Sequence, residues 1–453
     1  MRAFLSLLLL GVAFASVGLP AGGVQGPARR TLLEGARLIA GDGGAPFENA
    51  AILVEDDTIA RVGRRGEVPA PPGTVRVDLA GKTVIPGMVS AHGHVGYLRG
   101  LTFSAANYTR ANLVDHLNRY LYYGIVAMMS TGTDPGELPF QLRTEPHPGA
   151  LFLTAGPGFA APGASTNNLA MRGVAYGVIT EEQARRDVRA LAAKKPDFIK
   201  IWVDDRNGSV PKLSPPLYRA IIDEAHAQGI RVMAHVYYLA DAHALVDAGA
   251  DGFLHLVRDE EMDDALVAKM KARNMFVTPN LATSEAGTFS SAPAWLTDPV
   301  LAETATPEVI KKVTDVYASR ARAAASSAPR PAVASFARQQ RSLARLSAAG
   351  VTIALGDDTG IENTFFGYGE HHELELMVAA GMTPMQVLVA ATRTPADVLR
   401  LARLGTVEAG KSADFVVLDA NPLENIANTR RISSVYQRGQ AVDRAALRAS
   451  FGR

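Results

Sequence analysis

The chain contains no cysteine among its 453 residues. Disulfide bonds, thiolate metal ligands and a lipid-modified cysteine behind a leader are therefore all excluded. Neither sign of charge is in excess, because the chain has 46 basic and 45 acidic residues and a formal net charge of +1. No basic patch or acidic tail stands out, which argues against a nucleic-acid partner. What is present is an ordinary globular composition, with 47% hydrophobic residues, and a length typical of two or three domains or of one large barrel.

Long hydrophobic runs are missing as well, apart from a short run at the N-terminus. Residues 5–15 are almost all apolar, and the segment Ala13-Phe14-Ala15 fits the small-x-small pattern of a signal-peptidase site. The run is too short for a comfortable membrane span. A buried N-terminal helix is the alternative, but the Gly/Pro-rich stretch that follows argues against it. We predict a signal peptide over residues 1–25, an exported protein (periplasmic or secreted), and no stable membrane span after leader removal.

The remaining chain has β-rich ends and a middle in which strands and helices alternate. Short strands separated by turns are expected in residues 31–84, and short strands return after residue 404. Between them, apolar strand candidates alternate with helical stretches, which favours a parallel α/β architecture. These eight candidates cover residues 84–89, 124–129, 150–155, 197–201, 230–234, 251–254, 275–278 and 351–355.

This alternation predicts an α/β fold, with a (β/α)8 TIM-like barrel over residues 85–403. The two β-rich ends, residues 30–84 and 404–445, are predicted to form a small composite β-sandwich. About seventy residues separate the last two strand candidates, far more than a usual loop. Within this insertion, over residues 281–345, the Ala/Ser/Pro-rich stretch of residues 323–335 is expected to be a hinge or mobile segment between helices. An active-site lid and a solvent-facing helical insertion are equally good interpretations.

Polar residues that can bind a metal close five of the apolar strand candidates. A buried imidazole or ammonium without a partner is costly, so core packing does not explain them. In a barrel, the carboxyl ends of the strands meet at one mouth, where active sites lie. The pattern therefore predicts a metal site at that mouth, made of His92, His94, Lys200, His235, His255 and Asp358.

The histidines are the strongest part of this pattern. His92 and His94 are two residues apart, and on a strand that spacing points both side chains to one face. Taken alone the pair is weak evidence, because structural or surface histidines often have this spacing. His235 and His255, each at its own strand end, strengthen it. Imidazole nitrogens suit zinc, and also iron, nickel or cobalt.

Lys200 allows two interpretations. An ammonium cannot bind a metal, and its reference pKa of about 10.4 keeps it charged. Burial and neighbouring cations would lower that pKa, and a neutral amine could add carbon dioxide to become an anionic carbamate ligand. The alternative is an ion pair with Asp204 or Asp205, and spacing alone favours this ion pair.

The other polar positions at the mouth are also open to more than one interpretation. Asp357 and Asp358 are adjacent, and one of them is expected to face the mouth as metal ligand and general acid–base group. Asp357 could instead cap the turn at Gly360. Tyr97 and Tyr237 follow strand-end histidines and could hydrogen-bond a substrate, whereas simple wall packing is the alternative.

The strand-end residues, together with several segments, resemble the metal-dependent amidohydrolase superfamily, in its imidazolonepropionase-like and Xaa-Pro dipeptidase-like branch. The segments are residues 356–360, 372–376, 380–384 and 404–418. The resemblance covers nearly all of the chain from residue 31 to residue 440. It implies a distorted (β/α)8 barrel, a composite β-sandwich and a site for two divalent metal ions, usually zinc.

The resemblance also assigns roles to the metal ligands. His92 and His94 would hold the more buried metal together with Asp358, and His235 and His255 would hold the second. Lys200 would be N6-carboxylysine and bridge both metals, which reverses the preference drawn from spacing.

The catalytic role falls on Asp358 by the match to the Gly-x-Asp-x-Gly frame. This chain departs from the family motif at the preceding position, where Asp357 replaces the usual threonine.

The predicted function is hydrolysis of an amide-type C–N bond by a metal-bridging hydroxide, with Asp358 as general acid–base group. An N-acyl amino acid, a dipeptide or a related carboxylate-bearing amide is the expected small-molecule substrate, and a homo-oligomer is expected. An ester or lactone hydrolase, or a decarboxylase, would use the same metal site. A non-catalytic exported binding protein is the other alternative, but it predicts loss of ligands that are all present.

Overall fold

The structure, a computed structural model, describes residues 29–325 and 331–451. The predicted signal peptide over residues 1–25 lies outside the described residues. Within the described ranges, no helix combines the length and the apolar character needed to cross a membrane.

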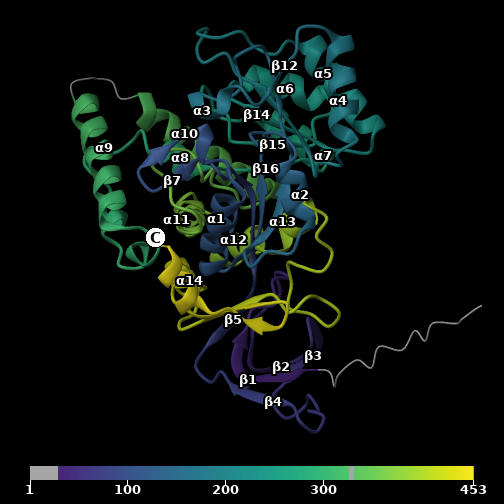
Figure 1. Cartoon of the computed structure of the whole chain (residues 1–453), viewed down its shortest axis with the longest axis vertical. Helices are drawn as coiled ribbons and strands as arrows, with labels where there is room; N and C mark the ends of the chain where they lie inside the picture. Colours follow the sequence, from purple (N-terminus) through teal and green to yellow (C-terminus); the bar gives the residue numbers. More distant parts are fainter. Residues whose placement is uncertain (1–28, 326–330, 452–453) are drawn as a thin grey trace, which may run out of the picture.

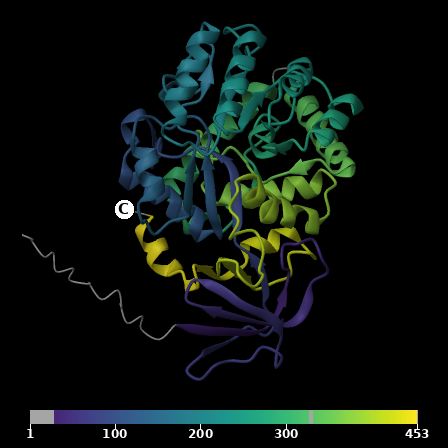
Figure 2. The same cartoon turned by 90° about the vertical axis from the view of Figure 1, so that its right-hand side faces the viewer.

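The two ends of the chain form one eight-stranded mixed sheet. Strand β1 (Arg30–Leu38) pairs antiparallel with β2 (Phe47–Glu55), and β18 (Phe415–Leu418) pairs antiparallel with β5 (Thr83–Pro86). Figures 1 and 2 show the purple N-terminal strands and the yellow C-terminal segment side by side below the rest of the molecule. The other members are β3 (Thr58–Arg64), β4 (Val75–Asp78), β19 (Ile432–Gln437) and β20 (Gln440–Ala441). The ends therefore pair as expected, whereas the sandwich stays a prediction.

The middle of the chain contains two parallel sheets. One consists of β6 (Met88–Gly93), β9 (Ile125–Ser130) and β10 (Leu151–Thr154). The other runs in the order β12 (Tyr176–Gly177), β11 (Phe159–Ala160), β13 (Ile199–Val203), β14 (Val232–Val236), β15 (Gly252–Leu254), β16 (Phe276–Thr278) and β17 (Thr352–Ile353). A small antiparallel pair, β7 (Leu98–Arg99) and β8 (Thr102–Phe103), lies outside both sheets.

Backbone hydrogen bonds connect the two parallel sheets at both edges. Ala91 N donates to Leu355 O at 2.7 Å, and Asp197 N donates to Thr154 O at 2.9 Å. Every residue of β6 and β13 is buried, which is expected for parallel strands covered on both faces. The α/β fold is confirmed, and the closed (β/α)8 barrel stays a prediction.

The sequence predicted one strand over residues 84–89, and this prediction is wrong. The structure has two strands, β5 in the sheet of the chain ends and β6 in the first parallel sheet, with Gly87 between them. A Cβ at Gly87 would lie 2.5 Å from Val126 Cγ1, so only glycine fits at this break. Each of the other predicted strands overlaps an observed strand.

Helices follow most of the parallel strands. At the start of α4 (Glu181–Ala192), the Thr180 hydroxyl accepts a hydrogen bond from Gln183 N and so caps the helix. The other helices are α1 (Arg110–Tyr122), α2 (Leu138–Thr144), α3 (Leu169–Arg172), α5 (Pro215–Ala227), α6 (Leu239–Ala248), α7 (Asp264–Ala272), α11 (Tyr368–Ala379), α12 (Pro384–Ala391), α13 (Arg393–Val398) and α14 (Arg444–Ser450).

The long insertion between β16 and β17 is mainly helical. It contains α8 (Leu281–Glu285), α9 (Pro307–Ala325) and α10 (Pro331–Ala349), and α9 stands at the left edge in Figure 1. The hinge predicted over residues 323–335 falls partly outside the described residues, at 326–330, and its two described ends belong to α9 and α10.

Candidate metal centre

All of the predicted metal ligands line one cavity of about 940 Å³. His92 belongs to β6, Lys200 to β13 and His235 to β14, while His255 directly follows β15. Asp358 follows β17 and faces them from the other side. The residues that the structure brings together are therefore His92, His94, Lys200, His235, His255 and Asp358.

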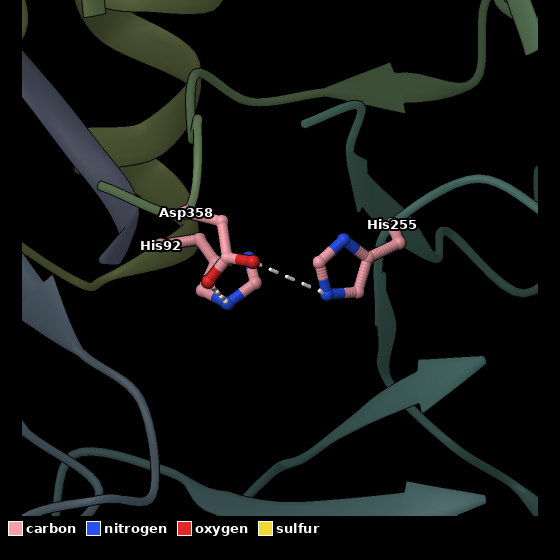
Figure 3. A group of neighbouring side chains, drawn as sticks. All are labelled: His92, His255 and Asp358. Carbon is pink, nitrogen blue, oxygen red and sulfur yellow. Dashed lines mark ion pairs between the residues drawn. The ribbon is translucent and has the colours of Figure 1, made fainter. Parts of the chain in front are cut away.

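The carboxylate of Asp358 lies among three imidazole rings. Its Oδ1 is 3.3 Å from His92 Nε2 and 3.0 Å from His94 Nε2, and its Oδ2 is 3.9 Å from His255 Nε2. In Figure 3 the carboxylate overlaps the His92 ring, and the His255 ring stands apart to the right with its nitrogen toward the carboxylate. One ligand atom from each of His92, His255 and Asp358 lies within 4.8 Å of the others. Nitrogen and carboxylate donors so arranged form a donor set for zinc and related divalent metals.

Burial fixes the charges of these groups. It lowers the pKa of His92 and of His255 well below the ordinary value, so both rings are neutral near pH 7. Burial alone would raise the pKa of Asp358, but the nearby imidazoles of His92 and His94 hold it below its usual range. Neutral imidazoles around an ionised carboxylate are the protonation states that metal binding requires.

Two buried atoms at the centre of this group lack a hydrogen-bond partner. They are His92 Nε2 and Asp358 Oδ1. Nearly all buried polar atoms in folded proteins are paired, so two unpaired buried polar atoms 3.3 Å apart call for an explanation. A divalent cation bound by both atoms would satisfy them, and the residues present therefore fit a metal ion.

The other two histidines of the cluster, His235 and His255, contact charged side chains. His235 Nε2 lies 3.3 Å from Asp204 Oδ2, and the His235 and His255 ring centroids are 4.6 Å apart. The Nη2 of Arg258 contacts His255 Nδ1 at 3.1 Å.

Lys200 is 1% exposed, and its Nζ lies 5.1 Å from the Trp202 ring centroid. Burial lowers the pKa of Lys200 to about 7, although Asp358 acts in the opposite direction. Within the described ranges Lys200 forms no ion pair with Asp204 or Asp205, because Asp204 contacts His235 and Asp205 accepts a hydrogen bond from Tyr238. Near pH 7, a large fraction of the protein molecules therefore carries Lys200 as a neutral amine.

Asp358, and not its neighbour Asp357, faces the cavity. Asp357 is 2% exposed and accepts hydrogen bonds from the backbone and hydroxyl of Thr359. Burial raises the pKa of Asp357 to about 6. Asp357 therefore stabilises the turn, which leaves Asp358 as the carboxylate available at the site.

Unusual backbone angles direct two of the ligands. His255 has φ +93° and Asp358 has φ +65°, a region that costs non-glycine residues about 1–3 kcal/mol and is found mainly at functional sites. Hydrogen bonds from His255 N to Thr278 O and from Asp358 N to His92 O hold these angles. At Gly360, with φ +102°, a Cβ would collide with the His94 carbonyl, which explains the last glycine of the Gly-x-Asp-x-Gly frame.

The two candidate substrate tyrosines occupy different environments. Tyr237 is partly exposed and lines the cavity. Tyr97 is 1% exposed and donates from its hydroxyl to the Thr133 carbonyl at 2.5 Å. Thr133 in turn contacts His94 Nδ1 through its hydroxyl at 2.8 Å, so Tyr97 supports a ligand from behind.

Residues that the sequence did not reveal contact the other nitrogens of the ligand rings. They are Thr133 at His94, Asn280 at His92 and Arg258 at His255. All of them lie outside the strands, where hydrophobic periodicity carries no signal. Asn280 has φ +53°, and only an Asn directly after a strand hints at such a position.

The insertion supplies one wall of the cavity. Ala282 and Ser284 belong to α8, Arg320 to α9, and Ser335 and Arg338 to α10, and all of them line the cavity. The insertion therefore covers the metal centre rather than pointing away into solvent.

Comparison with known proteins shows the family of the chain. The sequence profile described as the Amidohydrolase family matches residues 83–442. The Aspergillus niger protein named ochratoxinase is 27% identical over 473 residues, which cover 92% of this chain and 85% of that protein.

Solved structures show the same fold. A Xaa-Pro dipeptidase with bound methionine has a TM-score of 0.72 at 21% identity and covers 91% of this chain and 99% of its own. A putative prolidase from Bifidobacterium longum has a TM-score of 0.70 at 26% identity and covers 94% of this chain and 100% of its own. Molinate hydrolase has a TM-score of 0.71 at 20% identity and covers 93% of this chain and 96% of its own.

Proposed function

The chain belongs to the amidohydrolase family and is a hydrolase of C–N bonds, and on this premise we propose that it cleaves the amide bond of a small substrate that carries a carboxylate. N-acyl amino acids and dipeptides are the substrate classes that we favour. The observation that carries the proposal is the cluster of imidazoles around the ionised Asp358, in a cavity whose wall contains arginines.

In this proposal His92, His94 and Asp358 would hold one divalent ion, most simply zinc, and His235 and His255 a second. Lys200 would join the two sites as N6-carboxylysine. Its burial supports this assignment, because a neutral amine with a pKa of about 7 is the form that adds carbon dioxide. When bound, the metal ions supply Lewis-acid chemistry that polarises a carbonyl group and lowers the pKa of water.

Asp358 is the group that moves the proton. Its carboxylate is ionised, so the oxygen that does not bind a metal ion can accept the proton of the attacking water. It then donates that proton to the leaving nitrogen, which must be protonated before the amide C–N bond breaks. This is general acid–base catalysis by one positioned carboxylate.

Arginines in the cavity wall support a substrate with a carboxylate. Arg258 Nε, Arg206 Nη2 and Arg338 Nε are buried without a hydrogen-bond partner, and all three residues line the cavity. Guanidinium groups bind carboxylates through paired hydrogen bonds. Tyr237 lies beside Arg258, whose Cζ is 5.8 Å from its ring centroid. The Xaa-Pro dipeptidase among the similar structures is named for a dipeptide substrate, which has such a carboxylate.

The hydrogen bonds that connect the two parallel sheets also support a closed (β/α)8 barrel as the scaffold of this site. In such a barrel the ligands would all lie at the carboxyl ends of the strands.

A paired substrate panel tests the proposed function. The protein is assayed with zinc and with a chelator on N-acyl amino acids, dipeptides, the matching esters, and the same amides with the carboxylate masked. We expect hydrolysis of the free carboxylate amides, none after chelation, and weak hydrolysis of the masked amides. Faster cleavage of the esters than of the amides would favour an ester hydrolase, and equal rates with chelator would overturn the metal dependence.

Asp358→Asn tests the proposed proton transfer. This variant keeps an oxygen ligand but cannot accept a proton, so we expect it to retain metal and to lose about 10²–10⁴-fold in kcat. Metal analysis and turnover are measured on the same sample, and full turnover would remove Asp358 from the mechanism.

A further inference from the structure

Asn280 contacts the ring nitrogen of His92 that faces away from Asp358. Its Nδ2 lies 2.9 Å from His92 Nδ1, and its Oδ1 accepts a hydrogen bond from the Thr278 hydroxyl at 2.8 Å. Asn280, Thr278 and His92 are each 0% exposed. No water competes for these contacts, so the partner of Nδ1 decides where the single proton of the neutral ring lies.

The amide of Asn280 has two orientations with opposite consequences for His92. With Nδ2 toward the ring, Nδ1 accepts a hydrogen bond, and the ring proton must sit on Nε2, which faces Asp358. After a 180° turn of the amide, Oδ1 accepts the proton on Nδ1 and Nδ2 donates to the Thr278 hydroxyl. Only the second orientation leaves the Nε2 lone pair free, which a metal ligand requires.

We propose that Asn280 is the positioning residue that sets the tautomer of His92, with its Oδ1 toward Nδ1 when a cation occupies the site. This inference rests on the metal-binding role of His92 in the proposed function. It goes further because it assigns the control of that ligand to a residue that touches neither metal nor substrate.

The fold holds Asn280 in place from several sides. Asn280 N donates to Gly356 O at 3.3 Å, and asparagine tolerates its φ of +53° better than most residues. The next two backbone N–H groups, of Leu281 and Ala282, both donate to the Glu373 carboxylate at 2.8 Å. The backbone is therefore fixed, and either orientation of the amide would satisfy the same two partners, Thr278 and His92.

The other rings differ from His92 in this respect. The partner of His94 is the Thr133 hydroxyl, which can donate or accept, whereas Arg258 at His255 can only donate. Among the described residues that contact the ligand rings, Asn280 alone combines a donor and an acceptor at opposite ends of one rigid group.

Two substitutions separate the acceptor from the rest of the side chain. Asn280→Asp keeps an acceptor toward Nδ1 and tolerates the left-handed backbone, so it should bind zinc as tightly as the wild type or more tightly. Asn280→Gly removes the group without backbone strain and should weaken zinc binding about 10–100-fold. Asn274, which has φ +52° and is exposed, supplies the matched control Asn274→Gly, with unchanged binding expected.

Zinc affinity is measured by competition with a coloured chelator, starting from metal-free full-length protein, with thermal unfolding of each metal-free variant alongside. Unchanged affinity in Asn280→Gly, or equal weakening in Asn280→Asp and Asn280→Gly, would overturn the inference. If Asn280→Gly does not fold, the Asn280→Asp variant is sufficient by itself: weaker zinc binding than in the wild type would overturn the inference. Failure of the wild type to bind zinc would instead overturn the proposed function on which the inference rests.

Discussion

The two halves of the metal centre differ in the groups that surround their ligands. His92 and His94 contact neutral side chains, the Asn280 amide and the Thr133 hydroxyl, and both point Nε2 toward Asp358. On the other side, His235 faces the Asp204 carboxylate and His255 faces the Arg258 guanidinium. These charged neighbours also line the substrate cavity. All four histidines line the same cavity, so the halves differ in the charge of their neighbours and not in access to the cavity.

This difference assigns separate tasks to the two halves. A ligand held by neutral, buried partners changes little when substrate binds, so in the proposed function the His92 half would be the stable metal site. A ligand that contacts an arginine or a carboxylate responds when a charged substrate engages that neighbour. We therefore expect substrate recognition to act on the His255 half.

The largest effect on metal content and turnover is expected from substitution of Lys200, because Lys200 is the proposed bridge between the two halves. Lys200→Ala removes the proposed bridge, so the second metal should be lost, together with at least about 10²-fold in kcat, while the first metal remains on His92, His94 and Asp358. Metal analysis and turnover are compared with Lys200→Met, which preserves more of the side-chain volume and should behave in the same way. Loss of both metals would show that the halves are not independent, and full activity would exclude the bridge.

A smaller effect is expected at Arg258. Arg258→Gln removes a charged partner of the substrate carboxylate, worth about 1.5–3 kcal/mol, so KM should rise for free carboxylate amides and change little for the masked ones. The exposed Arg273 provides the control, Arg273→Gln. An equal rise of KM for both substrate types would assign Arg258 to the support of His255 alone.

The smallest effect is expected at Glu373, which supports the His92 half from behind. Burial raises the pKa of Glu373 from 4.5 to about 8, so the folded state keeps a proton that the unfolded state loses between these values. The free energy of unfolding of the wild type, relative to Glu373→Gln, should therefore fall as pH rises across this window, by up to about 1.4 kcal/mol per pH unit.

Urea titrations of both metal-free proteins at several pH values measure this difference. Parallel stability profiles for the wild type and Glu373→Gln would show that Glu373 is ionised in both states.

The sequence predicts the ligand positions because each ligand closes an apolar run, and the ends of parallel strands meet at one edge of the sheet. The structure differs at Lys200, which is the second residue of β13 and not its last. The sequence does not predict the partners of the ligand rings. The position of the Asn280 side chain depends on a left-handed backbone and on Glu373. Glu373 holds the next residue, Leu281, from 92 residues away in the sequence. No local pattern encodes a contact of that separation.

The same limit applies to the boundary between the sheets. Residues 84–89 form one apolar run in the sequence, yet the chain changes sheets at Gly87. The reason is the close approach of Val126, a contact that only tertiary packing creates.

Titration of metal-free protein with zinc, with amide hydrolysis followed at each step, tests the central claim most directly. The two-part metal centre predicts no turnover of an N-acyl amino acid or dipeptide without metal. It also predicts tight uptake of a first ion and turnover that rises as the second site fills. Turnover by metal-free protein at the full rate, or a protein that binds no zinc, would contradict the account.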